Sequence, residues 1–195
     1  MRVIAGKAGG LPLNVPASVT RPTTDRVREA LFSSLGDLVI DADVLDLYSG
    51  SGALGLEALS RGARSVIFVE ENAGACETIR KNLAKTRLET DAQVTVRHTS
   101  VSHFLETLSK GMGGAEPGFD LIFADPPYAR DATTRRELTA LLSQTPLVTA
   151  LRPEGVFALE ARDRDPLAFT DPPLWQSLRE RRYGDTWLHY LTPAA

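Results

Sequence analysis

The tetrapeptide Asp125-Pro126-Pro127-Tyr128 combines residue types that can bind an aromatic amine. The lone pair of such an amine is delocalised into its ring, so methylating it requires hydrogen bonds that hold the amine and favour a tetrahedral nitrogen. The Asp125 carboxylate can accept one N–H, and the Pro126 carbonyl can accept another because the residue after it has no N–H. Tyr128 can stack on the base and hold it near a methyl donor. A proline-stiffened turn with no chemical role is the alternative interpretation.

A glycine pattern, G-x-G-x-x-G at Gly50, Gly52 and Gly55, lies between an expected strand and an expected helix. Such glycines let a ligand approach the backbone and allow a tight turn into the helix. Glu70 ends the next expected strand, about 20 residues after Gly50, where a carboxylate can bind ribose hydroxyls. The pattern indicates a cofactor that contains a nucleoside, either NAD or S-adenosylmethionine. A tight turn without a ligand is the alternative.

Asp46, which precedes the glycines at the carboxyl end of the first expected strand, favours S-adenosylmethionine over NAD. A carboxylate attracts the ammonium group of a methionine moiety, whereas it would repel a pyrophosphate. We therefore predict S-adenosylmethionine as the cofactor. The predicted cofactor contacts are Asp46, Tyr48, Ser49, Gly50, Ser51, Gly52, Gly55, Glu70, Glu71, Ser100, Val101 and Asp125.

Strands and helices that could position these residues alternate along the chain. Apolar, β-branched stretches and helical periodicity predict the elements. The expected strands are 44–48, 65–70, 93–98, 119–124 and 155–161, and the expected helices are 24–35, 53–60, 73–86, 101–109 and 133–143. A hairpin is expected from 178–183 and 186–191, and another near the start, from Val3-Ile4 and 11–15. Alternating apolar strands and helices predict a mostly parallel sheet covered on both faces.

Length and composition indicate one ordinary intracellular domain. The chain has 195 residues, a net charge of −3 and a single cysteine, Cys76. Without an apolar leader or membrane-spanning stretch, we expect a soluble, cytoplasmic monomer. The histidines and Cys76 have no metal-ligand spacing, so no metal site is expected. Residues 1–36 carry five basic and two acidic side chains, which favours contact with nucleic acid, although chance in a short segment is the alternative.

These motifs resemble the class I methyltransferases of the (D/N)PP(Y/F) amino-methylating group, and most closely the RsmD family. The likeness covers nearly the whole chain. It rests on Arg2-Val3-Ile4-Ala5-Gly6 and Gly10, on RPTTDRVREALF at 21–32, on the segment from Gly50 to Ala63, and on DPPY at 125–128. The run at 21–32 is the most specific piece, because glycine loops and DPPY also occur in DNA adenine methyltransferases.

The resemblance implies a Rossmann-like α/β fold with a seven-stranded, mostly parallel sheet, an antiparallel last strand and a short N-terminal hairpin and helix extension. It divides the chain into an RNA-contacting extension, 1–36, and a methyltransferase domain, 37–195. It implies methyl transfer from S-adenosylmethionine to the exocyclic N2 of a guanine in 16S ribosomal RNA, within a small ribosomal subunit or its assembly intermediate. The family often has Asp or Asn at the adenine contact, where this chain has Ser100, a weaker acceptor.

Candidate RNA contacts are basic or polar residues of the extension and of the segment after DPPY. They are Arg2, Lys7, Arg21, Thr23, Arg26, Arg28, Arg130 and Arg135. The catalytic candidates are Asp125, Pro126, Pro127 and Tyr128. A DNA adenine-N6 methyltransferase is the nearest alternative, although no long insertion could serve as a DNA recognition domain. An NAD-dependent oxidoreductase and a non-catalytic RNA-binding relic fit the motifs less well.

Overall fold

The computed structural model describes residues 1–16, 24–109, 118–126, 132–162, 164, 166–170 and 173–194. They form two compact units, Met1–Val101 and Ser102–Ala195. In the described part of the chain, no helix is long and apolar enough to cross a membrane. The predicted extension, residues 1–36, lies within the first unit, and its separation from a methyltransferase domain stays a prediction.

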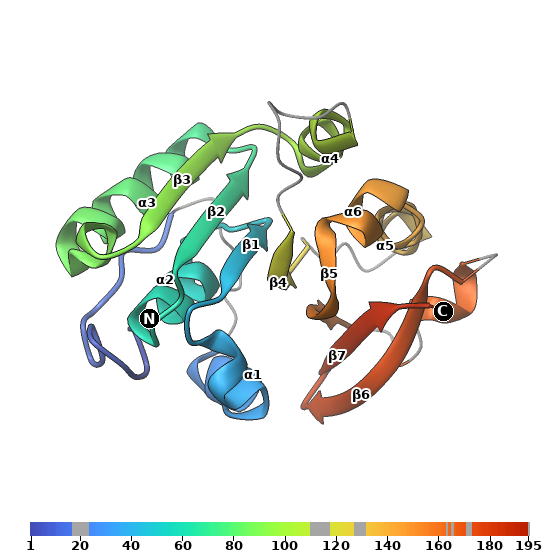
Figure 1. Ribbon diagram of the computed structural model, residues 1–195, viewed down its shortest axis with the longest axis horizontal. Helices are drawn as coiled ribbons and strands as arrows, with labels where there is room; N and C mark the ends of the chain where they lie inside the picture. The colour runs from blue at the N-terminus through green and yellow to red at the C-terminus, as the bar shows by residue number, and fades with distance from the viewer. Residues whose placement is uncertain are drawn as a thin grey trace. The chain divides into compact units, whose positions relative to one another are not determined.

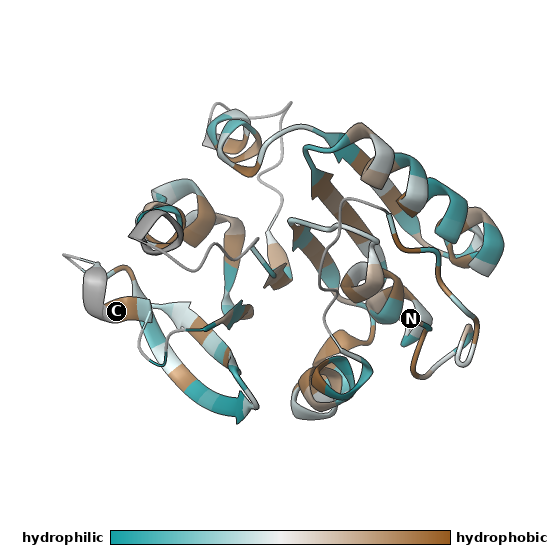
Figure 2. Cartoon of the chain, turned by 180° about the vertical axis from the view of Figure 1, so that it is seen from behind, coloured by the Kyte–Doolittle hydropathy of each residue, from teal (hydrophilic) through white to brown (hydrophobic). Residues whose placement is uncertain are grey.

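The first unit is built on three parallel strands in the order β3-β2-β1 (Figure 1). The strands are β1 (Asp43–Leu47), β2 (Ser65–Glu70) and β3 (Gln93–His98), which confirms three predicted strands. Parallel strands need crossover connections, and the helices α2 (Ala53–Ser60) and α3 (Ala73–Thr86) provide them. All eight residues of α2 are buried, whereas α3 has an outward polar face, which is teal in Figure 2.

Helix α1 (Asp25–Leu35) begins one residue later than predicted, with Thr24 as its N-cap, and ends at the predicted residue. The Thr24 hydroxyl accepts a hydrogen bond from the Val27 N–H, which satisfies one of the unpaired donors of the first turn. Gly36 ends the helix with a φ of 54°, a left-handed conformation that costs glycine little. Two short 3-10 turns, Gly36–Val39 and Leu88–Thr90, complete the unit.

The N-terminal arm, residues 1–16, forms the predicted hairpin. Its ladder joins Val3 N–H to the Leu11 carbonyl at 3.0 Å and Gly10 N–H to the Val3 carbonyl at 2.9 Å. Val3, Ala8 and Leu13 are buried, so the arm contributes apolar side chains to the core of the unit. The arm is therefore packed on the sheet-forming unit rather than extended into solvent.

The second unit contains four strands in the order β4-β5-β7-β6. They are β4 (Phe119–Ala124), β5 (Leu151–Ala161), β6 (Trp175–Tyr183) and β7 (Thr186–Pro193). Strands β4 and β5 are parallel, whereas β7 pairs antiparallel with both β5 and β6. The predicted closing hairpin is thus confirmed. Its helices are α4 (Val101–Ser109), whose first residue belongs to the first unit, α5 (Ala132–Leu142) and α6 (Thr145–Ala150), with a 3-10 turn at Pro166–Phe169.

Three features of this unit differ from the predictions. Helix α6 was not expected, and β5 and β6 begin earlier than predicted, at Leu151 and Trp175. The start of β5 was not predicted because Pro153 lies in it and proline is rare inside strands. Trp175 is fixed by tertiary contacts, because its indole N–H donates to the Leu142 carbonyl at 2.9 Å and its ring packs on Phe157.

Candidate functional site

The loop from Tyr48 to Gly52 connects β1 to α2 by a turn with left-handed backbone at three positions. The φ angles are 56° at Tyr48, 55° at Gly50 and 78° at Gly52. Glycine adopts this conformation at little cost, which explains two of the three residues. Tyr48 has a side chain and so holds a less favourable conformation, of the kind that clusters at functional sites.

Gly55 permits the close packing of α2 on β2. A Cβ atom at this position would lie 2.3 Å from Cε1 of Phe68 and 2.9 Å from Cγ1 of Val66. Both contacts are shorter than two carbon atoms can approach, so a larger residue would push the helix away from the sheet. The third glycine of the pattern therefore sets the distance between helix and strand.

Asp46 holds the start of α2 through its buried carboxylate. The side chain is 1% exposed, and Oδ2 accepts a hydrogen bond from the Gly55 N–H at 3.0 Å. A negative charge at the N-terminal end of a helix is stabilised by the helix dipole. The same end is where a dinucleotide pyrophosphate binds in Rossmann folds. The Asp46 carboxylate therefore gives this loop a charge that opposes an anionic ligand.

Ser49 fastens the loop to β2. Its backbone N–H donates to the Val69 carbonyl at 3.2 Å, and its Oγ accepts from the Val69 N–H at 3.0 Å. The hydroxyl also lies 2.6 Å from the Asp46 carbonyl oxygen, so it bonds to the end of β1 as well. Ser49 is buried, and its visible role is to join the ends of the two strands.

The Glu70 carboxylate lies beside the glycine loop. It accepts hydrogen bonds from the Gly50 N–H and the Asn72 N–H, each at 2.8 Å. The side chain is half-buried, so these bonds orient a carboxylate that solvent can still reach. The Glu70 carbonyl accepts from the Thr99 N–H at 3.0 Å, which brings the chain after β3 alongside.

The predicted cofactor contacts of the first unit gather at the carboxyl ends of its strands. Asp46 and the loop follow β1, Glu70 and Glu71 follow β2, and Ser100 and Val101 follow β3. Glu71 is exposed, Ser100 is half-buried and Val101 is buried as the first residue of α4. The carboxyl end of parallel strands is the usual ligand-binding edge of open α/β sheets.

In the second unit, Asp125 and Pro126 follow directly after β4. Asp125 is half-buried and Pro126 is buried. The two residues thus also occupy the carboxyl end of a parallel strand, because β4 pairs with β5 in parallel. Pro127 and Tyr128 lie outside the described residues.

Two of the four described candidate RNA contacts in the first unit are exposed but paired, and one is buried. Arg2 lies 3.4 Å from Asp25, and Lys7 lies 3.1 Å from Asp91. Arg26 is exposed on α1. Arg28 is wrong as an RNA contact, because its side chain is fully buried. Its Nη2 donates to Asp25 at 2.6 Å and to the carbonyl of Arg2 at 2.7 Å, so it joins α1 to the arm.

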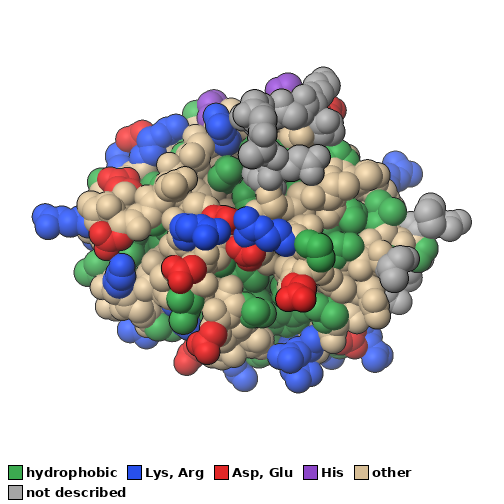
Figure 3. All heavy atoms as spheres, in the orientation of Figure 1, with side chains coloured by type: hydrophobic (Ala, Val, Ile, Leu, Met, Phe, Trp, Pro, Cys, Tyr) green, Lys and Arg blue, Asp and Glu red, His purple; other side chains and the backbone are tan. Residues whose placement is uncertain are grey.

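The remaining candidate RNA contacts cannot be placed. Arg21, Thr23 and Arg130 lie outside the described residues, and Arg135 lies on α5 with a side chain that is not described. On the face drawn in Figure 3, basic and acidic side chains are interspersed. Formal charge alone therefore does not delimit an RNA surface there.

Glu57 and Ser60, two polar residues of the buried helix α2, were not predicted to matter. The Glu57 carboxylate is fully buried and accepts from the Ile4 N–H at 2.6 Å and the Ala5 N–H at 3.0 Å. Ser60 Oγ accepts from the Ala8 N–H at 2.9 Å. A glutamate in an otherwise apolar helix is a signal of a buried polar partner, because an unpaired buried charge is costly.

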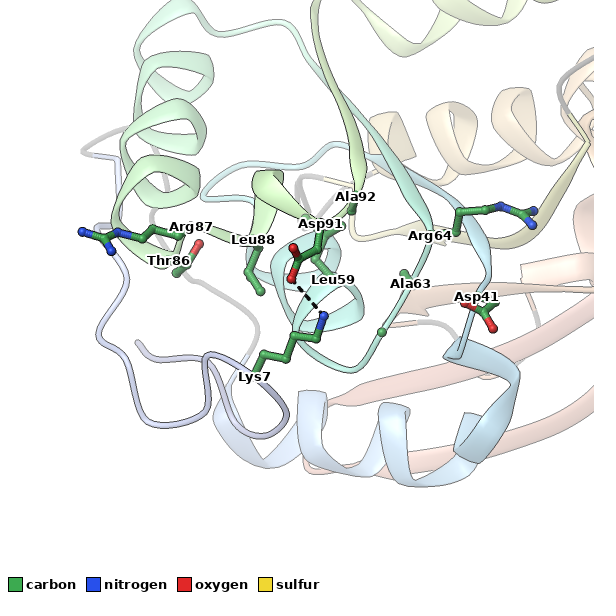
Figure 4. Close-up of a pocket in the computed structure, with 11 residues that line it drawn as sticks. Lys7, Asp41, Leu59, Ala63, Arg64, Thr86, Arg87, Leu88, Asp91 and Ala92 are labelled. Carbon is green, nitrogen blue, oxygen red and sulfur yellow. Dashed lines mark hydrogen bonds and ion pairs between the residues drawn. The ribbon is translucent and has the colours of Figure 1, made fainter.

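A cavity of about 270 Å³ lies away from the candidate cofactor loop, at the amino ends of the strands (Figure 4). Its lining includes Asp41 before β1, Arg64 before β2, and Asp91 and Ala92 before β3. Among the described residues that were predicted for catalysis, cofactor or RNA, Lys7 alone lines it, and its ammonium is paired with Asp91. The cavity is therefore separate from the candidate cofactor loop.

Comparisons with known proteins agree on one family. The family model described as "Conserved hypothetical protein 95" matches residues 1–192. "Putative rRNA methyltransferase YlbH" of Bacillus subtilis is 38% identical over 166 residues, which are 85% of this chain and 84% of that protein. "Ribosomal RNA small subunit methyltransferase D" of Haemophilus influenzae is 31% identical over 185 residues, which are 94% of this chain and 89% of that protein.

A solved structure extends the agreement to the fold. "Putative methyltransferase yhhF from Escherichia coli" is similar with a TM-score of 0.75 and 31% identity, over 100% of this chain and 98% of that chain. The expected Rossmann-like class I methyltransferase fold is thereby confirmed. The chain belongs to the Conserved hypothetical protein 95 family, which is the RsmD family of methyltransferases that its motifs resemble.

Proposed function

We propose that this protein transfers a methyl group from S-adenosylmethionine to the exocyclic N2 of a guanine in small-subunit ribosomal RNA. The relatives support the coarser statement, since the names of the Bacillus subtilis and Haemophilus influenzae proteins given above describe ribosomal RNA methyltransferases. The choice of guanine N2 comes from the resemblance to the RsmD family and is part of the proposal. A small ribosomal subunit or its assembly intermediate is the proposed substrate.

The observation that carries the cofactor assignment is the bond between the Asp46 carboxylate and the Gly55 N–H. It fills a donor at the start of α2 that a pyrophosphate would otherwise use, and it adds a negative charge there. A dinucleotide such as NAD is disfavoured for both reasons. A ligand with an ammonium group is attracted by the same charge. S-adenosylmethionine has both that ammonium and a ribose, so the residues present fit it.

Glu70 would hold the ribose of this cofactor. Its carboxylate is already oriented by the Gly50 and Asn72 N–H groups, and carboxylate oxygens have further lone pairs for two hydroxyls. Gly50 would let the cofactor lie against the loop backbone, since it has no side chain. Gly52 has a packing role instead, because a Cβ there would lie 3.2 Å from Ile79 and 3.3 Å from Phe68. Ser100 and Val101, after β3, are the proposed adenine contacts.

The bound cofactor supplies a methyl group on a positively charged sulfur, which is the electrophile of the reaction. Asp125 would accept one N–H of the target amine and so hold the nitrogen lone pair toward that methyl group. The Pro126 carbonyl would accept the second N–H, because it lies beyond the end of β4, where the ladder of the sheet no longer uses it. Tyr128 would stack on the base, which must leave its helix to be reached.

Nucleoside analysis of the modified RNA tests the proposal. The purified protein is incubated with S-adenosylmethionine and either a small-subunit rRNA transcript, an assembly intermediate of the subunit or duplex DNA, and the digested nucleosides are identified by mass spectrometry. N2-methylguanosine in either RNA sample is the expected product. N6-methyladenine in the DNA sample would support the adenine-methylating alternative. No methylated nucleoside in any sample would refute a nucleic-acid methyltransferase.

A further inference from the structure

Asn82, on α3, connects three segments of the first unit through one buried side chain. It is 0% exposed. Its Oδ1 accepts a hydrogen bond from the Asn14 N–H at 2.8 Å, and its Nδ2 donates to the Asn14 carbonyl at 3.0 Å and to the Ser51 carbonyl at 3.0 Å. The partners fix the orientation of the amide, because a backbone N–H can only donate and a carbonyl can only accept.

Ser51 is the residue between the first two glycines of the cofactor loop, and it is bonded to the arm from two sides. Its carbonyl accepts from Asn82, which also holds Asn14. Its Oγ donates to the Met1 sulfur at 3.2 Å. Ser51 is 5% exposed, so little water is available to replace either bond. Ser51 is therefore linked to both ends of the arm, to Met1 directly through its side chain and to Asn14 through Asn82.

The arm has other anchors that do not involve the loop. Glu57 binds the Ile4 and Ala5 N–H groups, and Lys7 pairs with Asp91 beside the cavity (Figure 4). These contacts fix the arm to α2 and to the start of β3. The arm is thus anchored through Asn82, Met1, Glu57 and Lys7. The anchors through Asn82 and Met1 reach the cofactor loop, whereas those through Glu57 and Lys7 do not.

We propose that Asn82 is a positioning residue that joins the N-terminal arm to the cofactor loop, so that binding of cofactor and binding of RNA strengthen each other. The inference rests on the proposed function and on the prediction that the extension, residues 1–36, contacts RNA. Asn14 itself is exposed, but a shift of the arm there would leave Oδ1 and one N–H of the buried Asn82 amide without these partners, which is costly. RNA bound to the arm would therefore also fix Ser51 in the cofactor loop. By thermodynamic linkage, if RNA strengthens cofactor binding by some factor, the cofactor must strengthen RNA binding by the same factor.

Asn82→Asp is the sharpest variant, because it hardly changes the volume of the side chain. It keeps the acceptor for the Asn14 N–H but places an oxygen where Nδ2 faces two carbonyls. Glu57→Gln is the matched control. Glu57 is equally buried and also binds two N–H groups of the arm, but its hydrogen bonds go to the arm and to Arg61 rather than to the loop.

Calorimetry measures the Kd for S-adenosylmethionine in the wild type and both variants, without and with a small-subunit rRNA transcript. In the wild type, RNA should lower this Kd by about fivefold or more, the smaller end of typical coupling. In Asn82→Asp, the Kd without RNA should rise about tenfold, as for one lost hydrogen bond, and the effect of RNA should vanish. In Glu57→Gln, the Kd without RNA should stay within about twofold of the wild type.

A wild-type Kd that RNA leaves unchanged would overturn the inference whether or not the variants fold. So would an Asn82→Asp protein with wild-type affinity, or a Glu57→Gln protein that loses as much affinity as Asn82→Asp. A wild type that binds RNA but not S-adenosylmethionine would instead refute the proposed function, and the coupling with it.

Discussion

The Asp46 carboxylate accepts a hydrogen bond from the Gly55 N–H at 3.0 Å, so a buried charge at the end of β1 holds the first turn of α2. Asp46→Ala removes this acceptor and leaves a buried N–H without it. We expect the free energy of unfolding to fall by about 1–3 kcal/mol. Asp46→Asn keeps an acceptor and should cost less stability, yet it should still weaken S-adenosylmethionine binding because the attraction to the ammonium is lost.

Chemical denaturation and calorimetry on the two Asp46 variants separate these effects. Asp37→Asn, at an exposed carboxylate of the 3-10 turn before β1, is the control and should change neither quantity. If Asp46→Asn binds the cofactor as tightly as the wild type, the carboxylate shapes the loop but does not contact the ammonium.

Glu70→Ala should weaken cofactor binding by about 1.5–3 kcal/mol, the range for a hydrogen bond to a charged group. The change removes the proposed ribose contact and also the acceptor for the Gly50 N–H. Glu77→Ala, at an exposed carboxylate on α3, is the control. Calorimetry that gives equal affinity for Glu70→Ala and wild type would exclude Glu70 from the ribose site.

Replacement of Arg26 and of Arg28 by alanine should affect different properties, RNA binding and stability respectively, although both lie in the basic extension, residues 1–36. Arg28 is fully buried and bonded to Asp25 and to the Arg2 carbonyl, so its loss should destabilise the fold by about 1.5–3 kcal/mol, the range for hydrogen bonds to a charged group. Arg26 is exposed, so its loss should leave stability unchanged and weaken RNA binding. A plot of the logarithm of the RNA-binding constant against the logarithm of the salt concentration has a negative slope. For single strands, each lost phosphate contact should make this slope shallower by about 0.7.

Thermal unfolding and filter binding at several salt concentrations test this pair. A salt slope that is the same in Arg26→Ala and in the wild type would remove Arg26 from the RNA contacts. An Arg28→Ala protein as stable as the wild type would contradict the structural role assigned to the buried guanidinium.

Burial raises the pKa of the Cys76 thiol, and the negative charge of Glu70 raises it further. Because the folded chain holds this proton more tightly than the unfolded chain, the resulting stability is complete below the ordinary thiol value of 9.0 and is lost as the pH rises through the raised value. Between pH 9.0 and the raised pKa, the unfolding free energy should therefore fall more steeply in the wild type than in Cys76→Ala. Parallel pH profiles of the two proteins would refute the assignment.

Local pattern was enough to predict most elements and the residues of the loop. Helix α2, for example, has the predicted bounds because a run of apolar residues follows a glycine turn that fixes its start. The pattern could not predict α6, because a proline such as Pro146 usually indicates a turn. In the structure it lies in the first turn of α6, where a helix tolerates proline.

Roles that depend on contacts between distant residues could not be predicted. Arg28 was expected to bind RNA because residues 1–36 carry more basic than acidic side chains, and only the packing of α1 against the arm shows that it is buried. Asn82 was missed for the same reason, since its partners Asn14 and Ser51 are 68 and 31 residues away in the chain. A polar residue on a helix is usually solvated, and nothing in its immediate surroundings distinguishes one that joins two loops.

Asp125→Ala should slow methyl transfer by two orders of magnitude or more, because a lost transition-state hydrogen-bond partner costs about 2.7–4 kcal/mol. Asp125 follows the carboxyl end of β4 and is half-buried, so the change should leave the fold and the affinity for S-adenosylmethionine close to wild type. Asp125→Asn retains an oxygen that accepts a hydrogen bond and should keep more activity than Asp125→Ala. Tyr128→Phe should be mild, whereas Tyr128→Ala should lose about 1–3 kcal/mol of base stacking.

Single-turnover kinetics with saturating cofactor measures the transfer step itself, and calorimetry on the same proteins supplies the affinity. Asp120→Asn, whose carboxylate pairs with Arg152 within the same strand pair, is the control for a charge change on β4 and should transfer methyl at the wild-type rate. An Asp125→Ala enzyme that transfers methyl as fast as the wild type would refute the proposed hydrogen bond between Asp125 and the target amine. Because the other predicted cofactor contacts, from Asp46 to Val101, lie in the first unit, that result would leave the assignment of S-adenosylmethionine intact.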